Sequence, residues 1–370
     1  MGITTILFIV FVVIVCIQNI YYTSFLFSFS TKRDDFRLKN NIPLSVIICA
    51  KNEAENLKKN IPFILNQNYS NFEIVLVNDS SSDETLDVME GFQDLHENIK
   101  IVDVKTTETF WGNKKYALTL GIKAASHEFL VFTDADCKPN SQKWLTYLSS
   151  KFSNEKSIVL GYGAYDKKPY SVLNKVIRFE TVMTALQYFS YTSMGSPYMG
   201  VGRNMAYRKP LFFNNSGFSN HMTLKSGDDD LFINEVANNK NTSIIYCKES
   251  FTISEPKTSI KDWVLQKRRH ISTAKFYRTK HKLLLGLFYS SQLIFWVLGA
   301  LLILLQYNLK WVLALIVLRF LIQILSFGLT ARKLNETDLI ILTPILEIFL
   351  ILTQLSIFIA NLISKPKHWK

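Results

Sequence analysis

Two aspartates one residue apart, Asp134 and Asp136, follow a short apolar run and come just before a proline. If residues 129–132 form a buried strand, side chains alternate between its faces, so both carboxylates point the same way at its end. Two like charges this close repel unless a cation lies between them, and a divalent ion with oxygen ligands is the usual solution. An isolated D-x-D is more often a solvated turn, so the surrounding segments must decide between the two interpretations.

The first half of the chain alternates between β-branched runs and helical patterns, which predicts a mainly parallel sheet covered on both faces. The predicted strands are 44–49, 72–77, 101–104 and 129–132, and the helices between them are 52–65, 85–95 and 114–126. In such sheets ligands bind beyond the carboxyl ends of the strands. Polar pairs follow three of these strands, at Asn52-Glu53, Asn78-Asp79 and Asp134 with Asp136. We therefore predict a ligand site at this edge of the sheet.

The second half is less regular, with strands expected at 158–162 and 243–247 and an aromatic-rich helix at 172–191. That helix carries Arg178 and Glu180 among apolar residues. Both a core helix and a helix lying against a membrane surface fit this pattern.

Apolar residues make up 48% of the chain and are concentrated at its two ends. Residues 3–29 carry no charge. The length of this uncharged segment exceeds the roughly 20 residues needed to cross a bilayer. Without a basic region before it or a cleavage site after it, this segment is expected to be an anchor rather than a cleaved signal peptide. Three more spans are expected near 283–306, 311–329 and 339–363.

Basic residues directly after the first span predict that the central domain is cytoplasmic, in an integral protein of the inner or plasma membrane. They are Lys32, Arg33, Arg37 and Lys39. Three further crossings would place the basic tail at Lys365–Lys370 outside, which conflicts with the same rule, so the last stretch can also be interfacial. Glu347 within that stretch is unusual, because a carboxylate in hydrocarbon is costly and tends to face protein or water.

The formal net charge is +12, but the basic residues form no nucleic-acid-binding signature. They gather next to apolar segments, so membrane lipids rather than nucleic acids are the expected partners. The four cysteines are widely scattered without C-x-x-C spacing, which predicts reduced thiols and no zinc site.

The chain lacks both the G-x-x-x-x-G-K-S/T loop of nucleotide hydrolases and the G-x-G-x-x-G loop of dinucleotide enzymes. A metal bound by one or two carboxylates suits a diphosphate ligand. A second acidic cluster, Asp228 to Asp230, can supply a base that deprotonates an incoming hydroxyl. Together these features predict group transfer from a nucleoside-diphosphate compound.

Six segments in order resemble the membrane-anchored, inverting family 2 glycosyltransferases of GT-A fold, and they span about residues 44–270. The segments are SVIICAKNEAENL, VLVNDSSSDET, FTDADCKP, GVGRNMAYRK, SGDDDLF and WVLQKRRH. The resemblance implies an α/β Rossmann-like domain with transmembrane helices. It also implies a nucleotide-sugar donor, a divalent metal (Mn or Mg), and a glycan or lipid-linked acceptor.

The resemblance also implies roles on the donor side. Asp79 matches the acid that holds the nucleotide base, with Glu53 beside it. Asp136 matches the metal ligand, and Asp134 would lie near the donor's ribose or phosphate. Lys114 resembles a donor-contacting lysine.

On the acceptor side, Gly202 and Asn204 match the acceptor motif, and Asp229 matches the general base. Asp228 stands where the family usually has glutamate, and three acids in a row leave the choice of base open. We assign Asp230 to stabilisation of a helix N-terminus.

The last segment departs from the Q-x-x-R-W motif of polymer-extending members, because His270 follows Arg269 where tryptophan is usual. Gln266 and Arg269 remain suited to a diphosphate and an acceptor hydroxyl. Trp263 or Trp111 is then the candidate sugar platform. Single sugar transfer is therefore expected, with a processive synthase and a catalytically silent, sugar-nucleotide-binding scaffold as the alternatives.

The expected domain order follows from these features. It is a membrane anchor at 1–30, a basic linker at 31–43, the GT-A domain at 44–260, a basic interfacial segment at 261–282, three transmembrane helices at 283–363 and a basic tail at 364–370.

Overall fold

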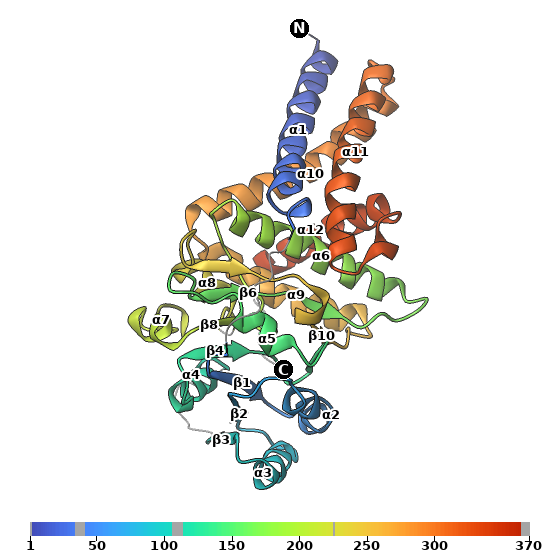
Figure 1. Ribbon diagram of the computed structural model, residues 1–370. Coiled ribbons are helices and arrows are strands. Elements are labelled where there is room, and N and C mark those ends of the chain that lie inside the picture. Colours follow the sequence, from blue (N-terminus) through green and yellow to red (C-terminus); the bar gives the residue numbers. More distant parts are fainter. Residues whose placement is uncertain (1, 34–40, 106–113, 225, 364–370) are drawn as a thin grey trace. The chain divides into compact units, whose positions relative to one another are not determined.

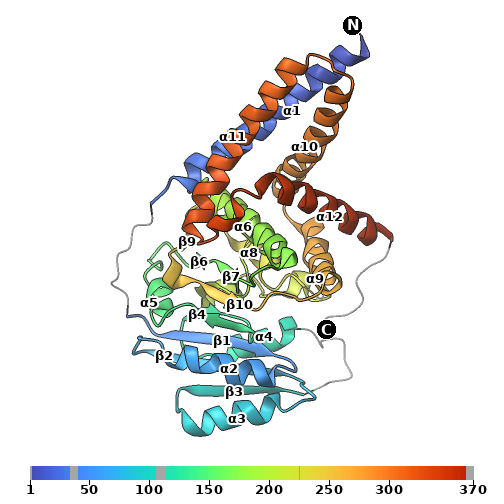
Figure 2. The same cartoon turned by 90° about the vertical axis from the view of Figure 1, so that its right-hand side faces the viewer.

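The computed structural model describes residues 2–33, 41–105, 114–224 and 226–363, which form two compact units (Figures 1 and 2). The α/β unit contains Asp34–Pro169 and Thr192–Thr258. The helical unit contains Met1–Arg33, Tyr170–Tyr191 and Ser259–Lys365. The predicted boundary of 44–260 therefore differs from the observed grouping, in which residues 170–191 belong with the two ends of the chain.

A seven-stranded sheet forms the centre of the α/β unit, in the order β3-β2-β1-β4-β8-β6-β9. Its strands are β1 (Leu44–Ala50), β2 (Phe72–Asp79), β3 (Ile99–Val104), β4 (Phe129–Phe132), β6 (Ile158–Leu160), β8 (Met205–Arg208) and β9 (Thr242–Ile244). The first four strands run parallel to one another, β8 is antiparallel to β4 and β6, and β6 and β9 are parallel. The predicted mainly parallel sheet is confirmed.

Helices flank the strands of this sheet, as Figure 2 shows. They are α2 (Ala54–Leu65), α3 (Thr85–Leu95), α4 (Lys114–Ala124), α5 (Trp144–Ser149), α7 (Lys209–Asn214) and α8 (Asp230–Val236). Val46 and Ile48 of β1 pack into a core with apolar residues of α2 and α5, whereas Ile47 between them lies close to Gly121 of α4. Both faces of β1 are thus buried, which explains its unbroken apolar sequence.

A second, three-stranded sheet lies in the same unit, in the order β5-β10-β7. Its strands are β5 (Cys137–Pro139), β7 (Gly163–Tyr165) and β10 (Thr252–Ser254). Since β5 begins one residue after Asp136, this sheet supports the far side of the D-x-D turn.

Four helices of the helical unit are long and apolar enough to cross a membrane. They are α1 (Ile3–Phe25, continued by a π-helical segment at Leu26–Ser30), α10 (Thr279–Leu304), α11 (Leu309–Lys333) and α12 (Thr343–Ile363). Two further helices, α6 (Val172–Ser193) and α9 (Ile260–Thr273), complete the unit. Val176, Ile177 and Phe179 of α6 are buried, so α6 is a core helix of this unit.

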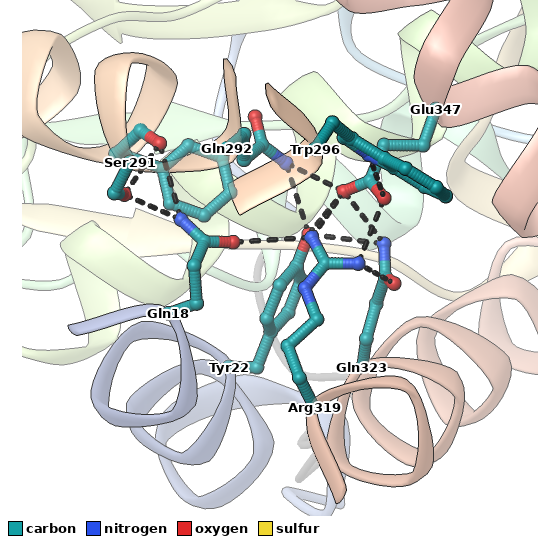
Figure 3. Close-up of polar contacts among 9 residues, drawn as sticks. Gln18, Tyr22, Ser291, Gln292, Trp296, Arg319, Gln323 and Glu347 are labelled. Atoms are coloured by element: carbon teal, nitrogen blue, oxygen red, sulfur yellow. Dashed lines mark hydrogen bonds and ion pairs between the residues drawn. The ribbon is translucent and has the colours of Figure 1, made fainter. Parts of the chain in front are cut away.

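Glu347, the unusual carboxylate of the last apolar stretch, forms an ion pair with Arg319 of α11 (Figure 3). The two Arg319 Nη atoms lie 2.8 and 2.5 Å from the Glu347 oxygens, and both side chains are buried. The remaining members of this buried polar cluster are Gln18, Tyr22, Ser291, Gln292, Trp296 and Gln323. The cluster draws on all four membrane-length helices, so the cost of each charge in apolar surroundings is offset within the protein.

Two glycines test the packing of helices on the sheet. A Cβ on Gly121 would lie 2.6 Å from Val77 Cγ2, whereas a Cβ on Gly91 of α3 would meet nothing within 4 Å. Gly91→Ala should therefore stabilise the protein by roughly 0.5–1 kcal/mol, as alanine does inside helices. Gly121→Ala should be less stable than Gly91→Ala by roughly 1–3 kcal/mol because of overpacking. Unfolding midpoints of the purified variants measure this, and equal stabilisation by both would contradict the packing of α4 on β2.

Candidate active site

The loops that follow β1 and β2 are joined by hydrogen bonds from Asn52, whose φ is 55°. Its backbone N–H donates to Ser81 Oγ at 3.0 Å, and its Oδ1 accepts from the Ser82 N–H at 2.8 Å. Asp79, the last residue of β2, is buried, and this burial raises the pKa of its carboxyl group.

Two hydrogen bonds fix Glu53. Its backbone N–H donates to Thr85 Oγ1 at 2.8 Å, and Asn56 Nδ2 donates to its carboxylate.

The D-x-D turn forms a possible cation site. Carboxylate oxygens of Asp134 and Asp136 and the sulfur of Cys137 all lie within 4.8 Å of one another. Burial, followed by the charge of Asp134, raises the pKa of Asp136, so a cation between the two would relieve a repulsion that the fold creates.

Cys137 is buried, and that burial raises the pKa of its thiol. Its Sγ lies 3.3 Å from Asp136 Oδ1 and 3.0 Å from Ser254 Oγ. A protonated thiol donates to a carboxylate but binds metals poorly. The oxygen donors that remain suit a hard ion such as Mg²⁺ or Mn²⁺.

Lys114, the first residue of α4, connects the D-x-D turn with the second acidic cluster. Its Nζ lies 2.7 Å from Asp134 Oδ1 and 3.3 Å from Asp228 Oδ2. Burial alone would lower the pKa of this ammonium group, but Asp134 and then Asp228 raise it well above its usual value. Lys114 is therefore a permanent cation between the two clusters.

Asp229 occupies a closely fitted position in the second cluster. The Gly202 N–H donates to its Oδ2 and the Asp230 N–H to its Oδ1, both at 2.7 Å. Burial, then Asp228 and Asp230, raises the pKa of Asp229 to about 8. A Cβ at position 202 would lie 3.3 Å from Asp229 Oδ2, so glycine there allows the close approach. Asp229 can thus take up a proton near neutral pH.

Asp228 and Asp230, the other acids of the cluster, are buried, whereas Asp229 is half-buried. Asp230 begins α8, and its Oδ1 accepts from the Leu231 N–H at 2.8 Å, in keeping with the predicted N-terminal role. Lys115 fixes the loop before the cluster, since its Nζ donates to the carbonyls of His221, Leu224 and Ser226 at 2.7, 3.1 and 2.8 Å. The sequence analysis did not single out Lys115, although it adjoins Lys114.

Asn204 lies in the interior and is fully hydrogen-bonded. Its Nδ2 donates to the carbonyls of Tyr162 and Ser250, each at 2.8 Å, and its Oδ1 accepts from Trp144 Nε1 at 3.1 Å. The structure therefore places Asn204 as a support for the Gly202 segment, with no amide hydrogen left for an acceptor.

Arg203, between Gly202 and Asn204 in the sequence, is a functional candidate that the sequence analysis missed. Its guanidinium group donates to the Gly163 carbonyl at 2.7 Å and to Ser254 Oγ at 3.1 Å, and it lies 4.1 Å from the centre of the Tyr165 ring. It thus joins β7 to β10, next to the strand that follows Asp136. Its place in the GVGRNMAYRK segment was the available signal.

Gln266 and Arg269 lie on α9 of the helical unit, and both are half-buried. Their contact with substrate remains a prediction. Trp263 of the same helix is buried, so its ring offers no exposed face for a sugar. Trp111, the other candidate platform, lies outside the described residues.

Comparison with known proteins gives two overlapping family matches. The model described as glycosyl transferase family 2 matches residues 45–213, and the model described as glycosyl transferase family group 2 matches residues 151–329. Among solved structures, the fold is similar to the mannosyltransferase PcManGT from Pyrobaculum calidifontis, solved with GDP-Man and Mn²⁺. The TM-score is 0.60 and the identity 16%, over 90% of this chain and 99% of that one.

Two curated relatives match shorter segments. An uncharacterized glycosyltransferase of Haemophilus influenzae is 38% identical over 29% of this chain and 33% of its own length. A poly-beta-1,6-N-acetyl-D-glucosamine synthase of Staphylococcus epidermidis is 33% identical over 25% of this chain and 21% of its own. The chain thus matches a third or less of these relatives' lengths. The two family models match overlapping parts of residues 45–329, so the chain carries glycosyltransferase family 2 domains.

Proposed function

We propose that this chain is a membrane-anchored glycosyltransferase that moves a sugar from a nucleotide diphosphate sugar to an acceptor hydroxyl with inversion. The observation that carries the proposal is the contact of Lys114 with both Asp134 and Asp228. One side chain thereby joins the D-x-D turn to the acidic cluster that contains the candidate base, Asp229. The product would belong to a surface polysaccharide, a glycolipid or a lipid-linked glycan.

On the donor side, Asp79 and Glu53 would hold the nucleotide at the ends of β1 and β2. Asp136 would hold a divalent ion, Mn²⁺ or Mg²⁺, which stabilises the negative charge that develops on the departing diphosphate, and Asp134 would lie near the donor's ribose or phosphate. Lys114 would contribute a second positive charge there. PcManGT was solved in complex with GDP-Man and Mn²⁺, so a related fold accommodates both kinds of ligand.

On the acceptor side, Asp229 would take the proton of the attacking hydroxyl. Its two oxygens are oriented by backbone N–H donors, and its raised pKa suits proton transfer near neutral pH. The hydroxyl oxygen would form the new bond to the sugar carbon as the bond to the diphosphate breaks. One such displacement inverts the configuration and needs no covalent intermediate. Gln266 and Arg269 would assist by hydrogen bonds to the diphosphate or the acceptor.

The four membrane-length helices support an integral membrane location, and Lys32 and Arg33 after α1 support a cytoplasmic catalytic domain. From this placement we infer that the acceptor binds at the membrane face and is either a growing glycan or a lipid-linked sugar.

Two alternatives remain open to experiment. The polymer-forming relative of Staphylococcus epidermidis favours a processive synthase, whereas His270 in place of tryptophan favours single addition. Product length separates the two, since single additions support our proposal and long chains support a synthase. A silent scaffold would bind donor without any transfer.

Asp136→Ala should lower metal-dependent transfer by roughly 100-fold or more, because the stabilisation that a bound ion gives the departing diphosphate is worth several kcal/mol. Expression and membrane insertion should match the wild type, and the unfolding temperature should not fall, because the variant removes a carboxylate that Asp134 repels. The exposed Asp94→Ala variant controls for loss of one carboxylate. Undiminished transfer by Asp136→Ala would remove its metal role.

Asp229→Asn should retain donor binding but lose transfer by roughly 10²- to 10⁴-fold, the usual contribution of general base catalysis. Donor binding is measured by titration and transfer by product formation on the same preparation. Asp228→Asn and Asp230→Asn are the matched controls. If either of these shows the binding-without-transfer phenotype instead, the base is not Asp229.

The raised pKa of Asp229 also has a consequence for stability. Between the unfolded value of about 4 and the folded value of about 8, the folded protein binds a proton that the unfolded chain does not. Asp229 therefore makes stability fall as pH rises through this window, and asparagine removes that effect. The unfolding temperature of Asp229→Asn minus that of the wild type should increase from pH 5 to pH 8. A difference that stays constant would show that Asp229 ionises normally.

A further inference from the structure

The helix α9 carries the two residues, Gln266 and Arg269, to which the proposed function assigns contacts with substrate. At 3.6 residues per turn, these two positions lie about 60° apart around the helix, while Lys267 and Arg268 between them point to other sides. Neither of these intervening residues has a role in the proposed reaction. The contacts of Lys267 and Arg268 show what fixes the orientation of α9 about its own axis.

Lys267 pairs with Glu180 of α6, at an Nζ to Oε2 distance of 2.5 Å, with each side chain 14% exposed. The same stretch of α6 carries Arg178, whose Nε donates to Glu336 Oε2 at 2.8 Å and which also pairs with Asp338. Glu336 and Asp338 lie in the connection from α11 to α12. One side of α9 is therefore tied through α6 to the membrane-length helices.

Arg268 holds another side of α9 against the end of α12. Its Nε donates to Asn361 Oδ1 at 3.0 Å and its Nη2 to the Ala360 carbonyl at 3.2 Å. Asn361 Nδ2 donates in return to the backbone carbonyl of Arg268 at 3.1 Å. This reciprocal pair fixes both the side chain and the main chain of α9 at that residue.

The helix α12 is itself anchored at the position of Glu347, in the buried cluster of Figure 3. Fourteen residues separate Glu347 from Asn361, which is about 21 Å along a helix. The buried Glu347 carboxylate pairs with Arg319 and also accepts hydrogen bonds from Gln292 and Gln323, so it has few alternative positions. The end of α12 that contacts Arg268 is thereby a fixed support.

If the basic interfacial segment at 261–282 served only to bind lipid headgroups, its charged side chains would be exposed. Lys267 and Arg268 are instead paired with side chains of their own unit. We propose that Lys267 and Arg268 are positioning residues, which clamp α9 between α6 and α12 and so hold Gln266 and Arg269 in one orientation. This inference rests on the proposed function of that pair.

The test is a charge exchange in the full-length protein. Lys267→Glu and Glu180→Lys should each lower kcat by about tenfold, with a smaller change in the donor KM, because misorientation affects the transition state more than ground-state binding. The double variant restores an opposite-charge pair and should recover kcat to within about threefold of the wild type. Lys261→Gln, an exposed lysine of the same helix, should have no effect.

A second pair of variants introduces no reversed charge. Arg268→Gln and Asn361→Ala should each lower kcat, and the double variant should lose less than the sum of the two, because both remove the bond from Arg268 Nε to Asn361 Oδ1. If a charge-reversed single variant is not expressed as folded protein, the Arg268→Gln and Asn361→Ala variants still test the proposal. Unchanged kcat in Arg268→Gln, or failure of the charge exchange to recover kcat at an unchanged unfolding temperature, would overturn the positioning role.

Failure of the proposed function gives a different result. If Gln266→Ala and Arg269→Ala leave transfer unchanged, α9 has no substrate role, and the clamp then has no catalytic purpose. If those two variants lose transfer while the Lys267 and Arg268 variants do not, only the clamp is wrong.

Discussion

Like charges in a confined space are the constraint on which the site depends. Asp134 and Asp136 lie together after β4, and Asp228 and Asp229 lie together before α8. Asp228 is buried, and the other three are half-buried. Burial and the charges of neighbouring acids raise the pKa values of Asp136 and Asp229. Lys114 offsets part of this cost by pairing with one member of each group. The charge that remains on Asp136 is what makes a divalent ion a favourable addition.

The fold provides the rigidity that such an arrangement needs. Parallel strands end at one edge, which brings Asp79 and the D-x-D turn together although 55 residues separate Asp79 from Asp134 in the chain. The loop that carries Asp228 and Asp229 is fixed differently, by the three carbonyl contacts of Lys115 and by the Gly202 N–H. Acids held this firmly keep their spacing when a substrate arrives, which is the condition for electrostatic catalysis.

Much of the fold was predictable, because β-branched runs and helical periodicity are local signals: β4 and α3 have the bounds that their sequences predict. What could not be predicted depends on contacts between distant segments. Glu347 is conspicuous in the sequence, but its pairing with Arg319 follows only from helix packing. Likewise, the interior role of Asn204 and the grouping of α6 with the membrane-length helices have no local signature.

The central claim is that the carboxylates around Lys114 form a metal-dependent nucleotide-sugar site. The most direct measurement is a titration of the purified full-length protein with a panel of uridine and guanosine diphosphate sugars, with Mn²⁺ and again with a chelator. We predict that one donor binds and is hydrolysed with Mn²⁺, and that its hydrolysis stops with the chelator. Hydrolysis that is equal with and without metal, or no binding by any donor, would contradict it.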